Sequence, residues 1–359
     1  MRAAFDRRST RTVRVGGVCI GGTHSVSIQS MTNTDTHDVD ATYDQVMRLA
    51  EAGCDIVRIT APDLKSVATF EALISRGVRV PLVADIHFNH EIAIAAAESG
   101  VSKIRINPGN IGDDGKVFRV VEACKKAAVP IRIGVNSGSL EKHILGKHGA
   151  PTPEALAESA LYHASLLERY DFSDIVISVK ASNVPDMIKA NRILAERTEY
   201  PLHLGVTEAG GGSSAIVKSS IGIGALLSEG IGDTVRVSLT DDPIEEIYAA
   251  NEILRALGMA KDPGLDIVSC PTCGRTKINL IALLSQFKER VKAEGLDRLN
   301  LKVALMGCVV NGPGEAREAD LGIAGGNGEG LLFRHGEIIR KVDEDKLIDA
   351  LIEEMKKQR

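Results

Sequence analysis

Short apolar runs alternate with longer amphipathic stretches from Ser25 to Leu257. Each run is brief and rich in Ile and Val, which is typical of a strand that is buried on both faces of a parallel sheet. The predicted strands are Val26–Ile28, Ile56–Ile59, Leu82–Ala84, Ile104–Ile106, Ile131–Val135, Ile175–Val179, Leu202–Leu204 and Val235–Leu239. The predicted helices between them are Tyr43–Ala52, Leu64–Arg76, His90–Glu98, Val117–Ala127, Pro153–Arg169, Pro185–Glu196, Ser214–Glu229 and Ile244–Leu257.

This alternation of strands and helices predicts an α/β fold, namely a (β/α)₈ TIM barrel. A doubly wound sheet is the alternative, but that fold usually has fewer units and a glycine-rich turn after its first strand, which is missing here. The segment Arg11–Gly22 has the pattern of a β-hairpin with a glycine turn. We expect this hairpin to close the N-terminal end of the barrel, so that the first domain covers residues 1–258.

A second, smaller domain is predicted at residues 265–359. The connector Gly258–Gly264 is short and polar, and it contains Pro263 and two glycines, as expected at a domain boundary. After it the pattern is that of an α+β module with a helix at Lys277–Ala293 and a last helix at Glu344–Lys357. Its strands are predicted at Lys302–Leu305, Leu321–Ala324, Gly330–Arg334 and Glu337–Val342.

The composition excludes several classes of protein. With 44% hydrophobic and 25% charged residues, the chain has the make-up of a folded globular protein rather than a disordered one. Aromatic residues are only 3%, Trp is absent and the net charge is -5, which argues against a nucleic-acid-binding protein. No apolar run approaches the ~20 residues that span a membrane, and the basic N-terminal stretch lacks the apolar segment of a signal peptide. We therefore expect a cytoplasmic protein with neither a nucleic-acid nor a membrane partner.

Polar side chains occupy the carboxyl ends of the predicted strands, where the active sites of (β/α)₈ barrels lie. Within each strand they are two residues apart and so share one face. Apolar residues of the other parity, such as Ile104 and Val179, should face the helices. The side chains predicted to point into the mouth of the barrel are Arg58, Thr60, Asp85, His87, Arg105, Asn107, Arg132, Gly134, Asn136, Ser178, Lys180, Ser182, His203, Glu208, Arg236 and Ser238.

The predicted cations of this set are Arg58, Arg105, Arg132, Lys180 and Arg236. Burying them without partners would be costly, so they either form internal ion pairs with Asp85, Glu208 and their neighbours or bind a polyanion. Cations at so many strand ends favour a polyanion, and arginine forks suit a phosphate or diphosphate, with Asn136 and Ser238 assisting. Glu208 is an acid in a cationic pocket, and we predict that it transfers a proton or positions a substrate hydroxyl.

The cysteines of the second domain have the spacing of metal ligands. Cys270-Pro-Thr-Cys273 places two thiols on one tight turn, and Cys308 supplies a third. No fourth cysteine follows, so Glu315 is the nearest candidate for the fourth ligand, with Asn311 or a water as alternatives. Three thiolates and one weaker ligand indicate an iron–sulfur cluster with one accessible iron rather than a zinc ribbon. The alternative for the Cys-x-x-Cys pair is a simple turn or a redox dithiol.

The other cysteines, Cys19, Cys54 and Cys124, lie in the hairpin, beside a strand and in a helix. We interpret them as small buried hydrophobic residues.

Several motifs together resemble one enzyme family. They are Ser30-Met-Thr-Asn-Thr34, Ile106-Asn-Pro-Gly-Asn110, Arg132-Ile-Gly-Val-Asn-Ser-Gly138, Ser178-Val-Lys-Ala-Ser182, Val206-Thr-Glu-Ala-Gly210, Cys270-Pro-Thr-Cys273-Gly and Gly307-Cys308-Val-Val-Asn-Gly-Pro-Gly-Glu315. In this order they cover nearly the whole chain. The chain resembles the 4-hydroxy-3-methylbut-2-en-1-yl diphosphate synthases, the iron–sulfur enzymes of the non-mevalonate isoprenoid pathway, in their shorter bacterial form.

The resemblance implies the cofactor, the reaction and the partners. It implies a [4Fe–4S] cluster held by Cys270, Cys273, Cys308 and Glu315, and a substrate, 2-C-methyl-D-erythritol 2,4-cyclodiphosphate, whose ring is opened by two electrons with loss of water. The electron donor would be flavodoxin or ferredoxin. The resemblance also implies a head-to-tail homodimer in which each active site is shared between two subunits.

The chain length gives a separate reason to expect a shared site. The last barrel helix, Ile244–Leu257, runs away from the mouth, so the chain enters the second domain at the opposite end. The connector Gly258–Gly264 spans at most about 25 Å when extended. The helix that it would have to retrace is ~20 Å long, so a subunit could reach its own mouth only with the connector fully stretched.

Two other classes of protein are compatible with the same pattern. One is a pterin-binding barrel of the dihydropteroate synthase or methyltransferase kind with a zinc module. The other is a non-catalytic scaffold that uses a structural zinc module beside a phosphorylated ligand. A colourless protein with one zinc would favour these classes, whereas a brown protein with iron and sulfide would favour the iron–sulfur enzyme.

Overall fold

The computed structural model of the chain describes residues 5–262, 264–309 and 316–358. Its internal contacts divide the chain into two compact units, Met1–Ala260 and Lys261–Arg359. Within the described residues, no helix is both long enough and apolar enough for a membrane span.

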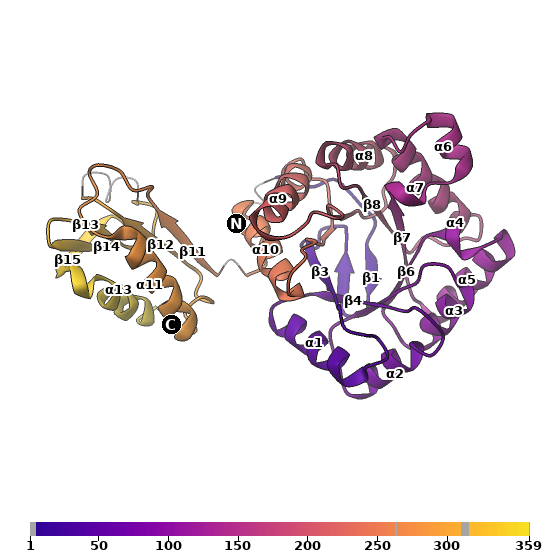
Figure 1. Cartoon of the computed structure of the whole chain (residues 1–359), viewed down its shortest axis with the longest axis horizontal. Coiled ribbons are helices and arrows are strands. Elements are labelled where there is room, and N and C mark those ends of the chain that lie inside the picture. Colours follow the sequence, from indigo (N-terminus) through magenta and orange to yellow (C-terminus); the bar gives the residue numbers. More distant parts are fainter. Residues whose placement is uncertain (1–4, 263, 310–315, 359) are drawn as a thin grey trace. The chain divides into compact units, whose positions relative to one another are not determined.

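The first unit is a ring of eight parallel strands with helices around it, so the predicted TIM barrel is confirmed (Figure 1). A bridge between Ile177 and Leu202 closes the ring between its first and last strands, β8 and β9. The strands are β3 (Ser27–Met31), β4 (Ile56–Thr60), β5 (Leu82–Asp85), β6 (Lys103–Ile106), β7 (Ile131–Asn136), β8 (Ile175–Lys180), β9 (His203–Leu204) and β10 (Thr234–Val235). The helices are α1 (Val39–Glu51), α2 (Val67–Ser75), α3 (His90–Glu98), α4 (Pro108–Ile111), α5 (Asp114–Ala127), α6 (Lys142–His148), α7 (Pro153–Glu168), α8 (Val184–Arg197), α9 (Gly212–Ser228) and α10 (Pro243–Ala256).

Local signals set the helix ends. Several N-termini are capped by a side chain, as where Asp38 accepts a hydrogen bond from the Ala41 N–H (3.0 Å) and Thr152 from the Ala155 N–H (3.2 Å). Gly53 and Gly100 adopt left-handed backbone angles just after α1 and α3, a conformation that favours glycine and ends a helix. The core between strands and helices consists mainly of buried Ile, Val, Leu and Ala. The apolar strand residues that were predicted to face the helices belong to it.

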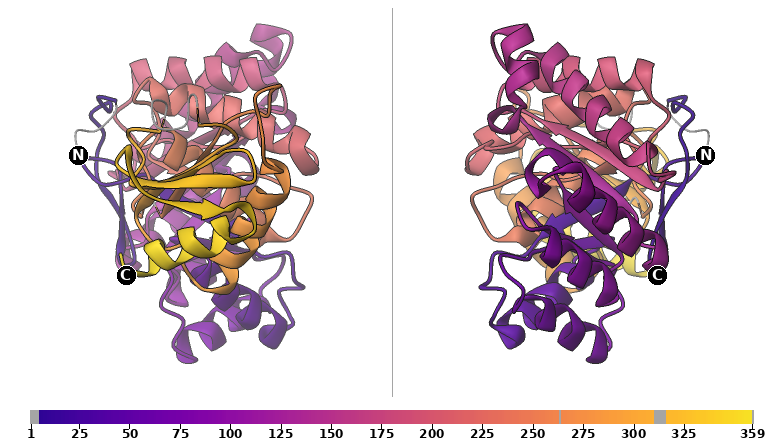
Figure 2. Two further views of the ribbon diagram at one scale, coloured as in Figure 1. Left: turned by 90° about the vertical axis from the view of Figure 1, so that its left-hand side faces the viewer. Right: turned by 90° about the vertical axis from the view of Figure 1, so that its right-hand side faces the viewer.

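The N-terminal hairpin closes one end of the barrel, as predicted. Its strands, β1 (Val13–Val15) and β2 (Val18–Ile20), are antiparallel. Their apolar residues form a separate cluster with Ile56, Val83 and Val176, which lie at the beginnings of their strands. The segment follows one end of the barrel (Figure 2), so the opposite end, at the carboxyl ends of the strands, is the one that this hairpin leaves uncovered.

The sequence misplaced some elements. The predicted strand Val235–Leu239 was too long, because β10 ends at Val235. The Arg236 N–H still donates to the Leu204 carbonyl of β9 (2.9 Å), but the Leu239 N–H donates to Glu246 Oε1 (3.1 Å). The short helices α4 and α6 were not predicted, because each has too few residues for a clear period.

The second unit is a five-stranded mixed sheet with two main helices (Figure 1). Its first strand was missed, because it is short and half polar. Helix α11 begins three residues later than predicted, since Asn279 caps it and the Lys277 N–H bonds to the Gly307 carbonyl. The elements are β11 (Leu265–Ser269), α11 (Leu280–Ala293), β12 (Leu301–Met306), β13 (Leu321–Gly325), β14 (Glu329–Arg334), β15 (Glu337–Asp343) and α13 (Leu347–Lys356).

Candidate active site at the mouth of the barrel

A cavity of about 120 Å³ lies at the carboxyl ends of the barrel strands. All five cations predicted for the mouth line it, together with one acid and several small or polar residues. The lining residues are Arg58, Asp85, His87, Arg105, Arg132, Gly134, Asn136, Ser178, Lys180, Thr207 and Arg236. The two-residue parity of the strands thus brings residues from five strands, β4 to β8, and from the segments after β5, β9 and β10, to one concave site.

Asp85 partly neutralises two of the cations. Its carboxylate lies 3.0 Å from Arg105 Nη1 and 3.6 Å from Arg58 Nε. Burial opposes ionisation of this carboxyl, but the charges of Arg58 and Arg105 outweigh burial and hold its pKa well below the usual value. Burial lowers the pKa of Arg58 to about 10, despite Asp85. Asp85 is therefore a built-in counter-ion of the site.

Arg236 is held by a carboxylate that the sequence did not indicate. Glu246, in the first turn of α10, is 3% exposed and accepts hydrogen bonds from Arg236 Nη2 (2.8 Å) and Nε (3.1 Å). The same carboxylate accepts from Ser30 Oγ (2.8 Å). This fork fixes the guanidinium, whose Nη1 donates to Ser238 Oγ (2.5 Å).

Arg132 and Lys180 supply the excess positive charge. Within the described residues neither forms an ion pair with a carboxylate, and Arg132 Nε and Nη1 have no hydrogen-bond partner although the side chain is 1% exposed. Burial, and then the like charges of Arg58 and Arg105, lower the pKa of Arg132 well below its usual value; burial, Arg236 and Arg58 do the same for Lys180. In the part of the chain that the structure describes, the ion pairs of the five cations are with Asp85 and Glu246 alone, so the cavity suits an anion.

Two glycines make room for the cations. A Cβ on Gly134 would lie 2.3 Å from Arg105 Nε, and a Cβ on Gly205 would lie 2.9 Å from Lys180 Nζ. Since real Cβ contacts are longer than this, each cationic side chain lies directly on a glycine backbone. Gly134 is one of the residues predicted to lie at the mouth, whereas the sequence did not indicate Gly205.

The remaining predicted mouth residues are placed differently. Asn107 caps α4, accepting from the Gly109 N–H (3.1 Å), and Ser182 is exposed. Glu208 is exposed and has a left-handed backbone angle (φ 52°) in the loop before α9. Together with Ser238, these residues are not among those lining the described cavity, whereas His87 is, with its Nε2 3.2 Å from Arg105 Nη1.

The thiols of the second unit lie on loops at the carboxyl ends of β11 and β12. Cys270 Sγ accepts a hydrogen bond from the N–H of Gly307 (3.2 Å), the residue before Cys308, so these two loops are in contact. Cys273 is exposed, and hydrogen bonds from the backbone and side chain of Arg275 lower the pKa of its thiol, which favours the thiolate.

The other cysteines behave differently. Burial raises the pKa of the Cys54 and Cys124 thiols to about 12, so they remain neutral, while Cys19 is partly exposed.

The donor chemistry of the second unit fits an iron–sulfur cluster. Cys270, Cys273 and Cys308 are free thiols, and the loops that carry the first and last of them touch. Glu315 and Asn311, the candidates for the fourth ligand, lie outside the described residues. Within the described ranges no three His, Cys, Asp or Glu residues are close enough together to hold a metal ion.

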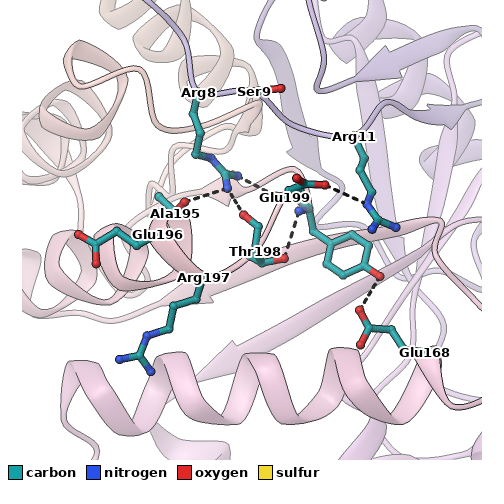
Figure 3. Close-up of a pocket in the computed structure, with 10 residues that line it drawn as sticks. Arg8, Ser9, Arg11, Glu168, Ala195, Glu196, Arg197, Thr198 and Glu199 are labelled. Atoms are coloured by element: carbon teal, nitrogen blue, oxygen red, sulfur yellow. Dashed lines mark hydrogen bonds and ion pairs between the residues drawn. The ribbon is translucent and has the colours of Figure 1, made fainter.

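A second pocket, of about 430 Å³, lies at the other end of the barrel (Figure 3). Arg8 reaches into it and donates to the carbonyls of Ala195 (3.2 Å), Thr198 and Tyr200 (2.7 Å). Arg11 pairs with Glu199 at 3.7 Å. These contacts anchor the N-terminal segment beneath the strands, and they explain the pocket without a ligand.

Comparisons with known proteins cover both units. The family profile described as the GcpE TIM-barrel domain matches residues 10–251, and the GcpE protein C-terminal domain matches residues 266–357. A curated relative from Clostridium perfringens, named 4-hydroxy-3-methylbut-2-en-1-yl diphosphate synthase (flavodoxin), is 58% identical over 97% of this chain and 98% of its own length. A relative of the same name from Geobacter sulfurreducens is 54% identical, covering 98% of each chain.

Solved structures agree on the fold of the first unit. A type I 3-dehydroquinate dehydratase from Clostridium difficile aligns with a TM-score of 0.51 and 14% identity, over 69% of this chain and 98% of its own. At this identity the likeness concerns the barrel fold alone.

Proposed function

Because the chain belongs to the family of 4-hydroxy-3-methylbut-2-en-1-yl diphosphate synthases, we propose that its barrel mouth binds a cyclic diphosphate and its second unit holds an iron–sulfur cluster. The reaction is the two-electron reductive ring opening and dehydration of 2-C-methyl-D-erythritol 2,4-cyclodiphosphate to (E)-4-hydroxy-3-methylbut-2-enyl diphosphate. The family match spans both units at high identity, which removes the support for a pterin-binding enzyme or a non-catalytic scaffold.

The observation that carries this proposal is the excess of cations in the mouth. Five cationic side chains share one cavity with a single carboxylate, Asp85, and Arg132 has buried N–H groups without a partner among the described residues. Burying several like charges close together costs free energy. A diphosphate that accepts hydrogen bonds from the arginine guanidinium groups offsets this cost. We assign substrate binding to Arg58, Asp85, His87, Arg105, Asn107, Arg132, Asn136, Lys180, Ser182, Arg236 and Ser238.

The change of charge during the reaction gives the cations a catalytic effect. The ring opens when a carbon–oxygen bond to the diphosphate breaks, and two electrons and one proton enter as water leaves. The cyclic diphosphate dianion thereby becomes an open diphosphate monoester with one more negative charge. Lys180 and Arg132 lack carboxylate partners within the described residues. Their attraction to the diphosphate is therefore stronger after ring opening, when the ligand carries one more negative charge, than before it. They therefore stabilise the transition state more than the substrate.

Glu208 is the residue that we assign to proton handling. It follows β9 by a few residues, at the same end of the barrel as the cations, and its left-handed backbone angle fixes it in a defined turn. A carboxyl there can position the substrate hydroxyl that leaves as water and hold a proton at it. Glu208→Gln should lower turnover more than diphosphate affinity, whereas a purely structural role predicts a loss of stability.

The cluster would be held by Cys270, Cys273, Cys308 and Glu315 as a [4Fe–4S] centre. When bound, such a cluster would supply the two electrons of the reduction. The carboxylate is the more labile ligand, because oxygen binds iron less tightly than thiolate does. The electron donor is flavodoxin or ferredoxin, and flavodoxin stands in the curated relatives' names. We place the protein in the cytoplasm.

We further propose a homodimer in which the cluster unit of one subunit serves the barrel mouth of the other. The reason is the connector: α10 ends at Ala256, away from the mouth, and few residues separate it from β11. The closing experiment pairs two inactive variants, Cys270→Ser and Lys180→Ala. Their heterodimer contains one intact barrel and one intact cluster on opposite subunits. Co-expression should restore activity, and heterodimers that stay inactive would refute the shared site.

A further inference from the structure

The interior of the barrel holds two bases that the proposed site does not use. Lys103 lies two residues before Arg105 on β6, and His203 lies on β9; both are 0% exposed. Within the described chain, Lys103 Nζ and His203 Nε2 have no hydrogen-bond partner. His203 Nδ1 lies 3.4 Å from Thr234 Oγ1. Neither base lines the mouth cavity.

The charged groups that act on the two bases are cations. Burial acts first, and then Arg132 on the neighbouring strand β7 and Arg58 on β4 lower the pKa of Lys103 well below its usual value. Burial, and then Arg132, Lys180, Lys103 and Arg58, lower the pKa of His203 in the same direction. On β5 the residue in register with Lys103 is the apolar Val83.

The buried carboxylates of the barrel are engaged by other partners. Asp85 pairs with Arg105 and Arg58, and Glu246 pairs with Arg236. Asp233, which precedes Thr234, pairs with Arg7 at 2.6 Å. The free protein therefore offers the bases no counter-ion among these groups, and their neutral forms are favoured.

We propose that Lys103 and His203 are an interior proton-acceptor pair, which takes up a proton from solvent when a diphosphate fills the mouth above it. The inference rests on the proposed diphosphate-binding function. A bound polyanion offsets the charges of Arg132 and Arg58, which add to the effect of burial in opposing a charge on Lys103, and such an interaction is strong in a low-dielectric interior. Since ring opening adds one negative charge to the ligand, an interior base that gains one proton keeps the site close to neutral.

Isothermal titration calorimetry with inorganic diphosphate measures this uptake. The heat of binding is recorded near pH 8 in buffers of different ionisation enthalpy. The slope of the binding heat against the ionisation enthalpy of the buffer gives the number of protons taken up per ligand. Lys103→Met should reduce this number by about one relative to the unsubstituted protein while binding persists. Lys126→Met, which removes an exposed lysine of α5, is the matched control and should leave the uptake unchanged.

Thermal unfolding of the free protein provides the second measurement. Replacing an unpartnered buried amine by an apolar side chain of similar length should raise the unfolding temperature of Lys103→Met. A lowered unfolding temperature, or a variant that does not fold, would mean that Lys103 is a paired structural cation and would overturn the inference. Diphosphate binding with unchanged proton uptake in Lys103→Met would overturn it as well. No binding by the unsubstituted protein would overturn the proposed function itself.

Discussion

Gly134→Ala tests whether Arg105 acts from the position that the structure shows. The added Cβ would lie 2.3 Å from Arg105 Nε and 2.8 Å from its Nη2, so the guanidinium must leave the strand surface. It would then lose its alignment with Asp85, now 3.0 Å away, and with the cavity. A charge-assisted hydrogen bond contributes about 1.5–3 kcal/mol. The dissociation constant for diphosphate should therefore rise about 10- to 150-fold.

Gly138→Ala is the matched control for this substitution. Gly138 follows the same strand, and a Cβ there would meet no atom within 4 Å. Calorimetric titration of both variants with inorganic diphosphate, together with their unfolding temperatures, separates binding from folding. Unchanged affinity in Gly134→Ala, or an equal loss in Gly138→Ala, would refute the placement of Arg105.

Three further predictions concern pH and the cluster ligands. The pKa of Lys180 is lowered in the free protein and raised by a bound anion, so diphosphate affinity should fall as pH rises above the free-state pKa; titrations of Lys180→Met should lack that part of the pH dependence. The folded-state pKa of His203 is lowered, so below about pH 6.5 the unfolded chain binds a proton that the folded chain does not. As the pH is lowered below this value, the free energy of unfolding should then fall by up to about 1.4 kcal/mol per pH unit. Denaturant titrations of His203→Gln should show a weaker dependence of the unfolding free energy on pH. Glu315→Ala should leave the cluster fragile and turnover low, and Glu315→Cys should keep the cluster but block the substrate; full iron content and turnover in Glu315→Ala would contradict its assignment as a ligand.

The sequence predicted the barrel because strand burial depends on local pattern. Ile and Val runs such as Ile131–Val135 mark strands covered on both faces, and the two-residue spacing of Arg58, Asp85, Arg105 and Lys180 with their neighbours marks the inward side. The structure brings all five predicted cations to one cavity. The predicted strand Val235–Leu239 was wrong in length, because the Leu239 N–H bonds to the Glu246 side chain of α10 instead of to a strand.

The sequence did not predict the residues whose role depends on tertiary contacts. Glu246 lies in the first turn of a helix, where acids are common for local reasons, and only the packing of α10 shows that it enters the barrel. Lys103 lies two residues before Arg105 and so faces the same side of the strand. Its inward position was not predicted, because the predicted strand began one residue later, at Ile104. Gly205 matters because the Arg236 carbonyl and the Lys180 side chain both lie against it, which no local pattern records.

The cationic barrel and the thiol-bearing unit are proposed to reduce a cyclic diphosphate together. The direct test is anaerobic incubation of the iron-reconstituted protein with 2-C-methyl-D-erythritol 2,4-cyclodiphosphate and reduced flavodoxin, followed by phosphorus NMR. We expect a brown protein that forms (E)-4-hydroxy-3-methylbut-2-enyl diphosphate, with the activity lost in Cys270→Ser. A reconstituted protein that contains iron and sulfide, accepts electrons and leaves the cyclic diphosphate unchanged would contradict it.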